Sequence, residues 1–202
     1  MPVTVRYLTH PQVLVDPQQE VGRWSLNPTG RARVRALAEG VAAGLGALSR
    51  TARVISSYET KAIETASPLA LELGVPLEIL PDMHENDRSA TGFLPPAEFE
   101  AVADQFFAEP GISVRGWETA EAAQARILAA ITACLEGPQP GDVLLVGHGA
   151  VGTLLYCALA GLGIDRRHDQ GPGGGGRWFG FDLDDRRPGP GWQLMETLLA
   201  EG

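Results

Sequence analysis

The pattern of apolar and polar residues alternates between short apolar runs and longer stretches with helical spacing. The runs predict strands over residues 3–9, 52–56, 75–80, 143–146, 178–183 and 192–195. Helical spacing predicts helices from Asn27-Pro28 to residue 48 and over 59–73, 96–107, 119–135 and 150–162. This alternation indicates an α/β fold, in which helices cover both faces of a mostly parallel sheet.

Local signals add detail to this pattern. Asn27 and Pro28 are typical of a helix N-cap and first turn, and Gly74 is expected to end the helix over 59–73. The uninterrupted apolar run 143–146 predicts a central strand that is covered on both faces. The polar stretch 81–92 predicts a loop that leaves the sheet, and such loops often carry function.

Length and charge limit the possible partners. The 202 residues fit a single domain over 1–202, and no repeat or linker divides them. The net charge of -9 argues against a broad surface for nucleic acid or for an acidic membrane, because such a field repels polyanions. A locally basic pocket can still bind a small anion.

Several features predict a cytoplasmic protein. No stretch approaches the roughly 20 apolar residues that span a bilayer, and the chain begins with a strand. Cys134 and Cys157 fall inside predicted helices without metal-ligand spacing, which suits buried free thiols in a reducing compartment. Neither a cofactor nor a metal is predicted, and the sequence leaves the oligomeric state open.

Two histidines, His10 and His148, each follow an apolar strand. In an open α/β sheet, residues at the carboxyl ends of strands meet where ligands bind, so we expect both to face one site. A neutral imidazole can attack phosphorus, a protonated one can stabilise anionic oxygens, and a carboxylic acid can protonate a leaving alcohol. The pair is therefore compatible with phosphoryl transfer.

Five segments that occur in a fixed order strengthen this interpretation. They are Thr9-His10-Pro11 and the segments 26–32, 56–66, 116–119 and 146–151. Together they resemble the histidine phosphatase superfamily, which includes metal-independent phosphoglycerate mutases and many small phosphatases. The resemblance spans about residues 1–160, and the order of the patterns makes it specific, since each is weak alone.

The resemblance implies a three-layer α/β/α sandwich and a metal-independent phosphomonoesterase. His10 would be the nucleophile that is transiently phosphorylated, and His148 would bind the transferring phosphoryl group. Glu85 is the best match to the general acid, and its neighbours His84 and Asp87 compete for the role. The partner would be a small phosphorylated molecule or inorganic phosphate.

This sequence departs from the family inside the expected phosphate pocket. Thr9 and Lys61 stand where the family has arginines, and Pro11 replaces a glycine. Lysine supplies charge without the planar fork of an arginine, so we expect weak activity unless another cation substitutes. The candidates for that cation are Arg6, Arg88 and Arg177. The expected phosphate-binding residues are Thr9, Ser57, Lys61, His148 and Gly149.

Two alternatives to the phosphatase remain. A catalytically weak binding or regulatory protein would keep the pocket without turnover, and a metal hydrolase would use His10, His84 and His148 with nearby acids. No ligand spacing supports the metal hydrolase. The glycine tract 171–176 lacks the lysine of a nucleotide loop and predicts a flexible connection that could overhang the pocket.

Overall fold

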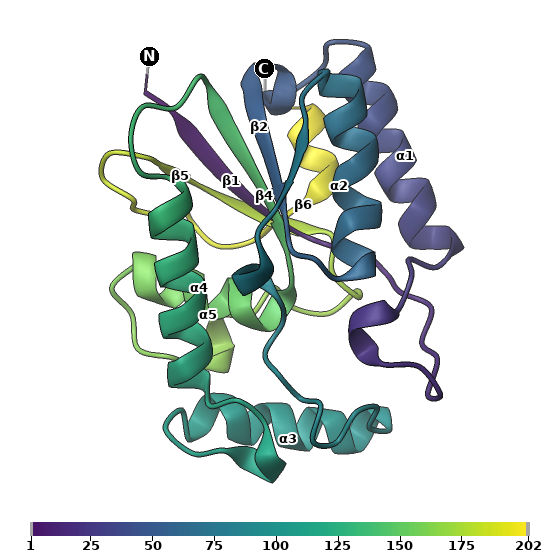
Figure 1. The fold of residues 1–202 in the computed structure, drawn as a ribbon, viewed down its shortest axis with the longest axis vertical. Helices are drawn as coiled ribbons and strands as arrows, with labels where there is room; N and C mark the ends of the chain where they lie inside the picture. The colour runs from purple at the N-terminus through teal and green to yellow at the C-terminus, as the bar shows by residue number, and fades with distance from the viewer. Residues whose placement is uncertain (1, 201–202) are drawn as a thin grey trace.

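A six-stranded, mostly parallel sheet forms the centre of the computed structural model, which describes residues 2–200 (Figure 1). Its strand order is β3-β2-β4-β1-β5-β6, and only β5 and β6 run antiparallel to their neighbours. The strands are β1 (Thr4–Thr9), β2 (Thr51–Ser56), β3 (Leu77–Ile79), β4 (Asp142–Gly147), β5 (Arg177–Asp182) and β6 (Gln193–Leu194). The predicted α/β class is confirmed.

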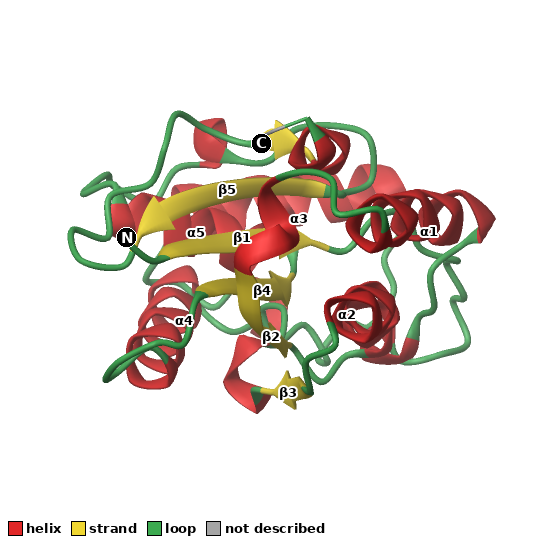
Figure 2. Cartoon of the chain, turned by 90° about the horizontal axis from the view of Figure 1, so that it is seen from above, coloured by secondary structure: helices red, strands yellow, loops and turns green. Residues whose placement is uncertain are grey.

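Helices cover both faces of this sheet (Figure 2). The helices are α1 (Pro28–Ala42), α2 (Thr60–Leu73), α3 (Pro96–Ala108), α4 (Ala120–Cys134) and α5 (Gly149–Leu159). Figure 1 shows α1 and α2 on one side of the sheet, α4 and α5 on the other, and α3 crossing below its end. Short 3-10 turns cover Val21–Arg23, Ala47–Arg50, Pro81–Met83, Val114–Gly116, Arg166–His168 and Met195–Leu199.

Alternating side chains on the strands build the two apolar cores. On β1, Val5 and Tyr7 pack with α4 and α5, whereas Leu8 packs with α1 and α2. All six residues of β4 are buried, and this strand lies between β2 and β1. The prediction of a central strand covered on both faces is therefore confirmed, and its burial explains the continuous apolar run.

Most predicted boundaries hold to within two or three residues, but the first helix ends earlier than expected. It stops at Ala42, and Gly44 and Gly46 follow with φ angles of 72° and 80°. A Cβ at Gly46 would lie 2.0 Å from the carbonyl oxygen of Leu198, so only glycine fits there. The apolar residue Leu48 is buried in a separate 3-10 turn and continues the core without continuing the helix.

The glycine tract 171–176 connects the 3-10 turn Arg166–His168 to β5. It lies against the loop after β1, because the Gly176 amide donates to the His10 carbonyl at 3.0 Å. Gly175 has φ 88°, and a Cβ there would lie 2.1 Å from the same carbonyl oxygen. The tract is thus a connection that packs closely beside His10.

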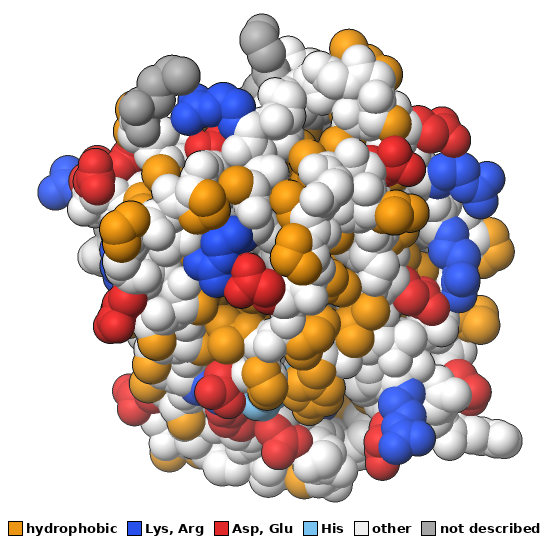
Figure 3. Space-filling model, turned by 45° about the horizontal axis from the view of Figure 1, so that its top comes forward, with side chains coloured by type: hydrophobic (Ala, Val, Ile, Leu, Met, Phe, Trp, Pro, Cys, Tyr) orange, Lys and Arg blue, Asp and Glu red, His pale blue; other side chains and the backbone are white. Residues whose placement is uncertain are grey.

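Both cysteines of the chain are free thiols, of which Cys157 is buried and Cys134 is half-buried. Within residues 2–200, no helix has the length and apolar character needed to cross a membrane. On the face shown in Figure 3, acidic, basic and apolar side chains are interspersed.

Candidate active site

The parallel pairing of the central strands brings the two histidines together. Thr9 on β1 pairs with Gly147 on β4, so the next residue of each strand, His10 and His148, leaves the sheet at the same edge. Their ring centroids lie 5.3 Å apart. Ser56, the last residue of β2, pairs with Val146 of β4, which adds the segment that follows β2 to this edge.

His10 is held in one tautomer by its own loop. Its Nδ1 lies 2.8 Å from the Pro11 carbonyl oxygen, which can only accept, so Nδ1 carries the proton and Nε2 keeps a lone pair. Burial, with a contribution from the charge of Lys61, lowers the pKa of His10 to about 4. The imidazole is therefore neutral near pH 7.

His148 is fully buried at the N-cap of α5. Its Nε2 lies 2.9 Å from Ser57 Oγ and 3.5 Å from Glu59 Oε1, and its buried Nδ1 has no partner among the described residues. Burial lowers the pKa of His148 well below its ordinary value. The Tyr7 hydroxyl accepts from the His148 amide at 3.0 Å and donates to its carbonyl at 3.1 Å, which fixes its backbone.

Glu59 is a site residue that the sequence analysis missed. It precedes α2 and is 6% exposed. Its Oε2 pairs with Lys61 Nζ, and its Oε1 accepts from the Glu85 amide at 2.8 Å. Burial would raise the pKa of Glu59, but the Lys61 ammonium and the bound Glu85 amide outweigh burial and hold the pKa below its ordinary value.

A signal for Glu59 was present in the sequence. It lies inside the matched segment 56–66, two residues before Lys61. An acid two residues away from the only lysine of that segment could have been proposed as its ion-pair partner. The lysine itself is 3% exposed and also donates to the Val21 carbonyl at 2.9 Å.

Glu85 lies at the N-terminus of α5, in the loop after β3. Its carboxylate accepts from the Val151 amide at 3.0 Å and from the Ala150 amide at 3.3 Å. Burial raises the pKa of Glu85, and the charge of Glu59 adds to this, while Arg88 and the amides of Val151 and Asn86 oppose it. A carboxyl group with a raised pKa is suited to hold a proton for transfer.

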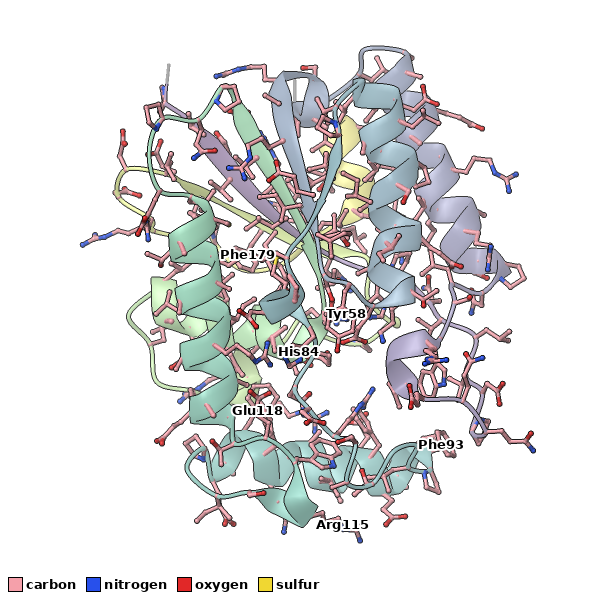
Figure 4. The ribbon with its side chains drawn as sticks, in the orientation of Figure 1. Tyr58, His84, Phe93, Arg115, Glu118 and Phe179 are labelled. Carbon is pink, nitrogen blue, oxygen red and sulfur yellow. The ribbon has the colours of Figure 1, made fainter. Side chains whose placement is uncertain are left out.

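Arg126 of α4 fixes the loop that carries Glu85. Its guanidinium donates to the carbonyls of Asp82, His84 and Glu85 at 2.7, 3.0 and 3.4 Å. The same group makes a two-pronged pair with the Glu118 carboxylate at 3.0 and 2.7 Å. Glu118, from the matched segment 116–119, thus has a structural role, and Figure 4 shows it below His84 beside α4.

Arg88 is a cation without an acidic partner among the described residues. Its buried Nε has no hydrogen-bond partner, and its guanidinium carbon lies 4.9 Å from the centre of the Phe99 ring. Burial lowers the pKa of Arg88, while the charges of Glu85 and Glu59 oppose that shift. Of the candidate arginines Arg6, Arg88 and Arg177, Arg88 is the one that lines a cavity of about 800 Å³ beside the site.

The other two arginines are engaged elsewhere. Arg6 pairs with Asp142, the first residue of β4, at 3.1 Å, and this places it toward the opposite end of the strand. Arg177 donates to the Pro172 carbonyl at 3.3 Å. Neither has a contact with His10, His148 or Glu85.

Thr9 and Gly149 are linked through a residue that was not anticipated, Gln170. The Thr9 hydroxyl donates to Gln170 Oε1 at 2.7 Å and accepts from the Arg177 amide at 3.0 Å. A Cβ at Gly149 would lie 2.2 Å from Gln170 Nε2, so a larger residue there would displace the end of the Gln170 side chain. The hydroxyl of Thr9 is therefore already satisfied by the connection to β5.

A cavity of about 800 Å³ opens beside these residues. Its lining comes from the turn at 20–23, the start of α2 and the loop after β3, and includes Glu59, Glu85 and Arg88 but not His10, Lys61 or His148. Tyr58 and His84, both labelled in Figure 4, also line the cavity, and their rings lie 6.0 Å apart. His84 Nδ1 donates to the Glu85 carbonyl at 2.6 Å.

Within residues 2–200, no three His, Cys, Asp or Glu side chains are grouped as ligands for a metal ion. Asp87 lies on the rim of the cavity, and its carboxylate accepts from the Ser89 amide at 2.9 Å. Its amide in turn donates to Glu118. Asp87 thus caps its own loop.

Sequence comparison defines the class of protein to which this fold and site belong. The model of the histidine phosphatase superfamily, branch 1, matches residues 13–174, and the chain belongs to this superfamily. No curated protein matches the sequence at a significant level.

Solved structures share the fold at low sequence identity. A mycobacterial glucosyl-3-phosphoglycerate phosphatase is 19% identical with a TM-score of 0.72, and covers 96% of this chain and 97% of its own. YhfR of Bacillus stearothermophilus is 19% identical with a TM-score of 0.73, over 93% and 94% of the two chains. A mutant phosphoserine phosphatase of Entamoeba histolytica, solved with phosphoserine, is 13% identical with a TM-score of 0.75, over 98% and 100%.

The role of Arg126 can be tested by the substitution Arg126→Met. It removes the donors to three loop carbonyls and leaves the half-buried Glu118 without its partner, so the free energy of unfolding should fall by about 2–3 kcal/mol. Urea denaturation measures this. Arg166→Met is the control: Arg166 pairs with the exposed Glu100 and Asp104, and its loss should cost less than about 1 kcal/mol. Equal losses in the two variants would contradict the role given to Arg126.

Proposed function

We propose that this protein is a metal-independent phosphomonoesterase that acts through a phosphohistidine at His10. The observation that carries the proposal is the bond from His10 Nδ1 to the Pro11 carbonyl, which leaves the lone pair on Nε2 of a ring whose centroid lies 5.3 Å from that of His148. Membership of the histidine phosphatase superfamily supports the same chemistry.

The reaction has two steps. Nε2 of His10 attacks the phosphorus of a monoester, the bond to the alcohol oxygen breaks, and Glu85 gives its proton to that oxygen. The Glu85 carboxylate then takes a proton from water, whose oxygen attacks the phosphohistidine and releases inorganic phosphate and neutral His10. The raised pKa of Glu85 and the lowered pKa of His10 support these opposite starting states.

Binding of the phosphoryl oxygens falls to several groups. We assign it to Lys61, Ser57, His148 and the amide of Gly149 at the N-terminus of α5. We also assign Arg88 to the phosphoryl oxygens, in place of the two arginines that the family has at the positions of Thr9 and Lys61. Arg88 lines the cavity and is a cation without an acidic partner in the described part of the chain. Thr9 is not included, because its hydroxyl is bonded to Gln170 and β5.

The substrate class is a small phosphorylated molecule. The cavity of about 800 Å³ has room for a small alcohol beyond the phosphoryl group. The mycobacterial phosphatase that shares this fold has been solved with inorganic phosphate and with VO3, which is in keeping with a phosphate-like ligand.

One observation favours a second candidate, a binding or regulatory protein with little turnover. Lys61, which stands in the place of an arginine, is already paired with Glu59, so it offers a phosphate less than a free cation would. Such a protein would hold phosphate compounds without forming a covalent intermediate.

A search for the phosphoenzyme separates the two candidates. Rapid quenching during turnover of a phosphomonoester panel should give an acid-labile, base-stable phosphohistidine that is absent in His10→Ala. The control His84→Ala removes another imidazole at the cavity and should keep the intermediate. Phosphate binding without a phosphohistidine or turnover across the panel would favour the binding protein.

The pH dependence of kcat/KM follows from the two shifted groups. The nucleophile must be neutral, so kcat/KM should rise as pH increases through about 4, the pKa of His10, and not through its ordinary 6.5. It should fall again as pH increases through the raised pKa of Glu85, because the acid loses its proton. Glu85→Gln should lower kcat about 10²–10⁴-fold for alkyl phosphates and less for p-nitrophenyl phosphate, whose leaving group needs no acid. A His10 ring that titrates near pH 6.5 in NMR spectra of the free protein would contradict a desolvated His10, because the acid limb of kcat/KM near pH 6 also contains the second ionisation of the monoester.

The role of Arg88 predicts a loss of phosphate affinity in Arg88→Met. One charge-assisted contact contributes about 1.5–3 kcal/mol, so the dissociation constant of vanadate should rise roughly 10- to 100-fold. Arg88→Lys should recover part of this, since it restores charge without the fork. Arg23 is exposed, pairs with Glu20 and lines the same cavity, so Arg23→Met should have a much smaller effect. An equal rise of the dissociation constant in Arg88→Met and Arg23→Met would contradict a direct contact of Arg88 with the anion. It would indicate that both arginines act only through the long-range electrostatic field of the cavity.

A further inference from the structure

The Glu59 carboxylate has the surroundings that a bound anion would have. It receives the Lys61 ammonium and the Glu85 amide, and the His148 imidazole lies 3.5 Å from its Oε1. Its side chain is 7% exposed, so solvent does little to screen these contacts. A carboxylate held in this way carries a full negative charge near pH 7.

Two of these three partners are groups to which the proposed function assigns the phosphoryl oxygens. Lys61 and His148 would have to bind the phosphoryl group, yet in this structure both face Glu59. One carboxylate oxygen is directed at the lysine and the other at the histidine and the Glu85 amide. The carboxylate thus takes up the charge of Lys61 and lies beside the His148 ring, whose Nε2 also lies 2.9 Å from Ser57 Oγ.

The position of Glu59 relative to the cavity adds a second observation. Glu59 lines the cavity, whereas Lys61 and His148 are 3% and 0% exposed and do not line it. The turn at 20–23 lies over this pair: Lys61 donates to the Val21 carbonyl, and a Cβ at Gly22 would lie 3.7 Å from Glu59 Cγ. A ligand that enters from the cavity therefore meets Glu59 before it reaches Lys61.

We propose that Glu59 is an internal anion that occupies the phosphoryl subsite of the resting protein, so that a phosphate group reaches Lys61 and His148 only when it displaces this carboxylate. The inference rests on the proposed function for the location of the subsite. Its consequence is selectivity. Inorganic phosphate gains only the contacts of the subsite, whereas an ester also gains contacts along the cavity that help it to compete with Glu59. The product should accordingly leave easily.

The first experiment measures anion binding without turnover. Glu59→Gln removes the charge at nearly constant shape, and Glu59→Leu also removes the hydrogen-bonding capacity. Calorimetric titration with inorganic phosphate and with vanadate should give dissociation constants at least tenfold lower than in the natural protein. Glu64→Gln is the matched control, because Glu64 lies on α2 one turn further on, pairs with Arg31 and does not line the cavity. It should change the constants less than twofold.

The possible results separate this inference from the proposed reaction. Tighter phosphate binding in the Glu59 variants without any phosphohistidine would keep the internal anion and remove the proposed reaction. A phosphohistidine at His10 together with unchanged or weaker phosphate binding in Glu59→Gln would overturn the internal anion alone. In that case Glu59 is a permanent partner that orients Lys61.

A second measurement uses the natural chain, in case the buried Lys61 does not tolerate loss of its partner. A crystal structure at saturating vanadate should show the Glu59 carboxylate away from Lys61, with Lys61 Nζ on an oxygen of the anion. Vanadate bound beside His10 while Glu59 keeps its contacts with Lys61 and His148 would overturn the inference. Thermal unfolding shows whether each Glu59 variant is folded. The anion titration applies to a folded variant, and the crystal structure of the natural chain decides if the variants do not fold.

Discussion

The parallel pairing of β1 with β4 is the constraint on which the site depends. It aligns Thr9 with Gly147, so that His10 and His148 leave neighbouring strands at one edge with their rings 5.3 Å apart. The fully buried Tyr7 hydroxyl ties the end of β4 to β1 through both backbone groups of His148. Ser57 Oγ and Glu59 Oε1 then lie 2.9 and 3.5 Å from Nε2 of His148.

The low polarity of this edge decides the protonation states. Burial opposes charge on both histidines and on Glu85, so three titratable groups are biased toward their neutral forms. The pKa of Glu59 shifts the other way, because its buried carboxylate pairs with Lys61. The site therefore combines a neutral imidazole, a carboxyl group with a raised pKa and an internal ion pair, and Arg88 is left as the unpaired cation among the described residues that line the cavity.

Patterns with a strong local cause were predictable. The buried strand β4, the N-cap at Asn27 and the helix end at Gly74 each follow from neighbouring residues, and the structure confirms them. The early end of α1 was missed, because helical spacing persists to Leu48 while the turn at Gly46 is set by contact with the backbone at Leu198. A periodic pattern cannot report a contact made 152 residues later in the chain (198 − 46).

By itself, the sequence determined the fold class and the superfamily, since these depend on periodicity and on ordered motifs. It also predicted that His10 and His148 lie close together at the ends of two strands, as the structure shows. It also identified Glu85 and Lys61 as candidates. Only the tertiary structure decided which charges meet: Lys61 with Glu59, Arg6 with Asp142, and Arg88 with none among residues 2–200. The physical reason is that the state of a buried charge depends on partners within a few ångströms, and folding brings these from distant parts of the chain.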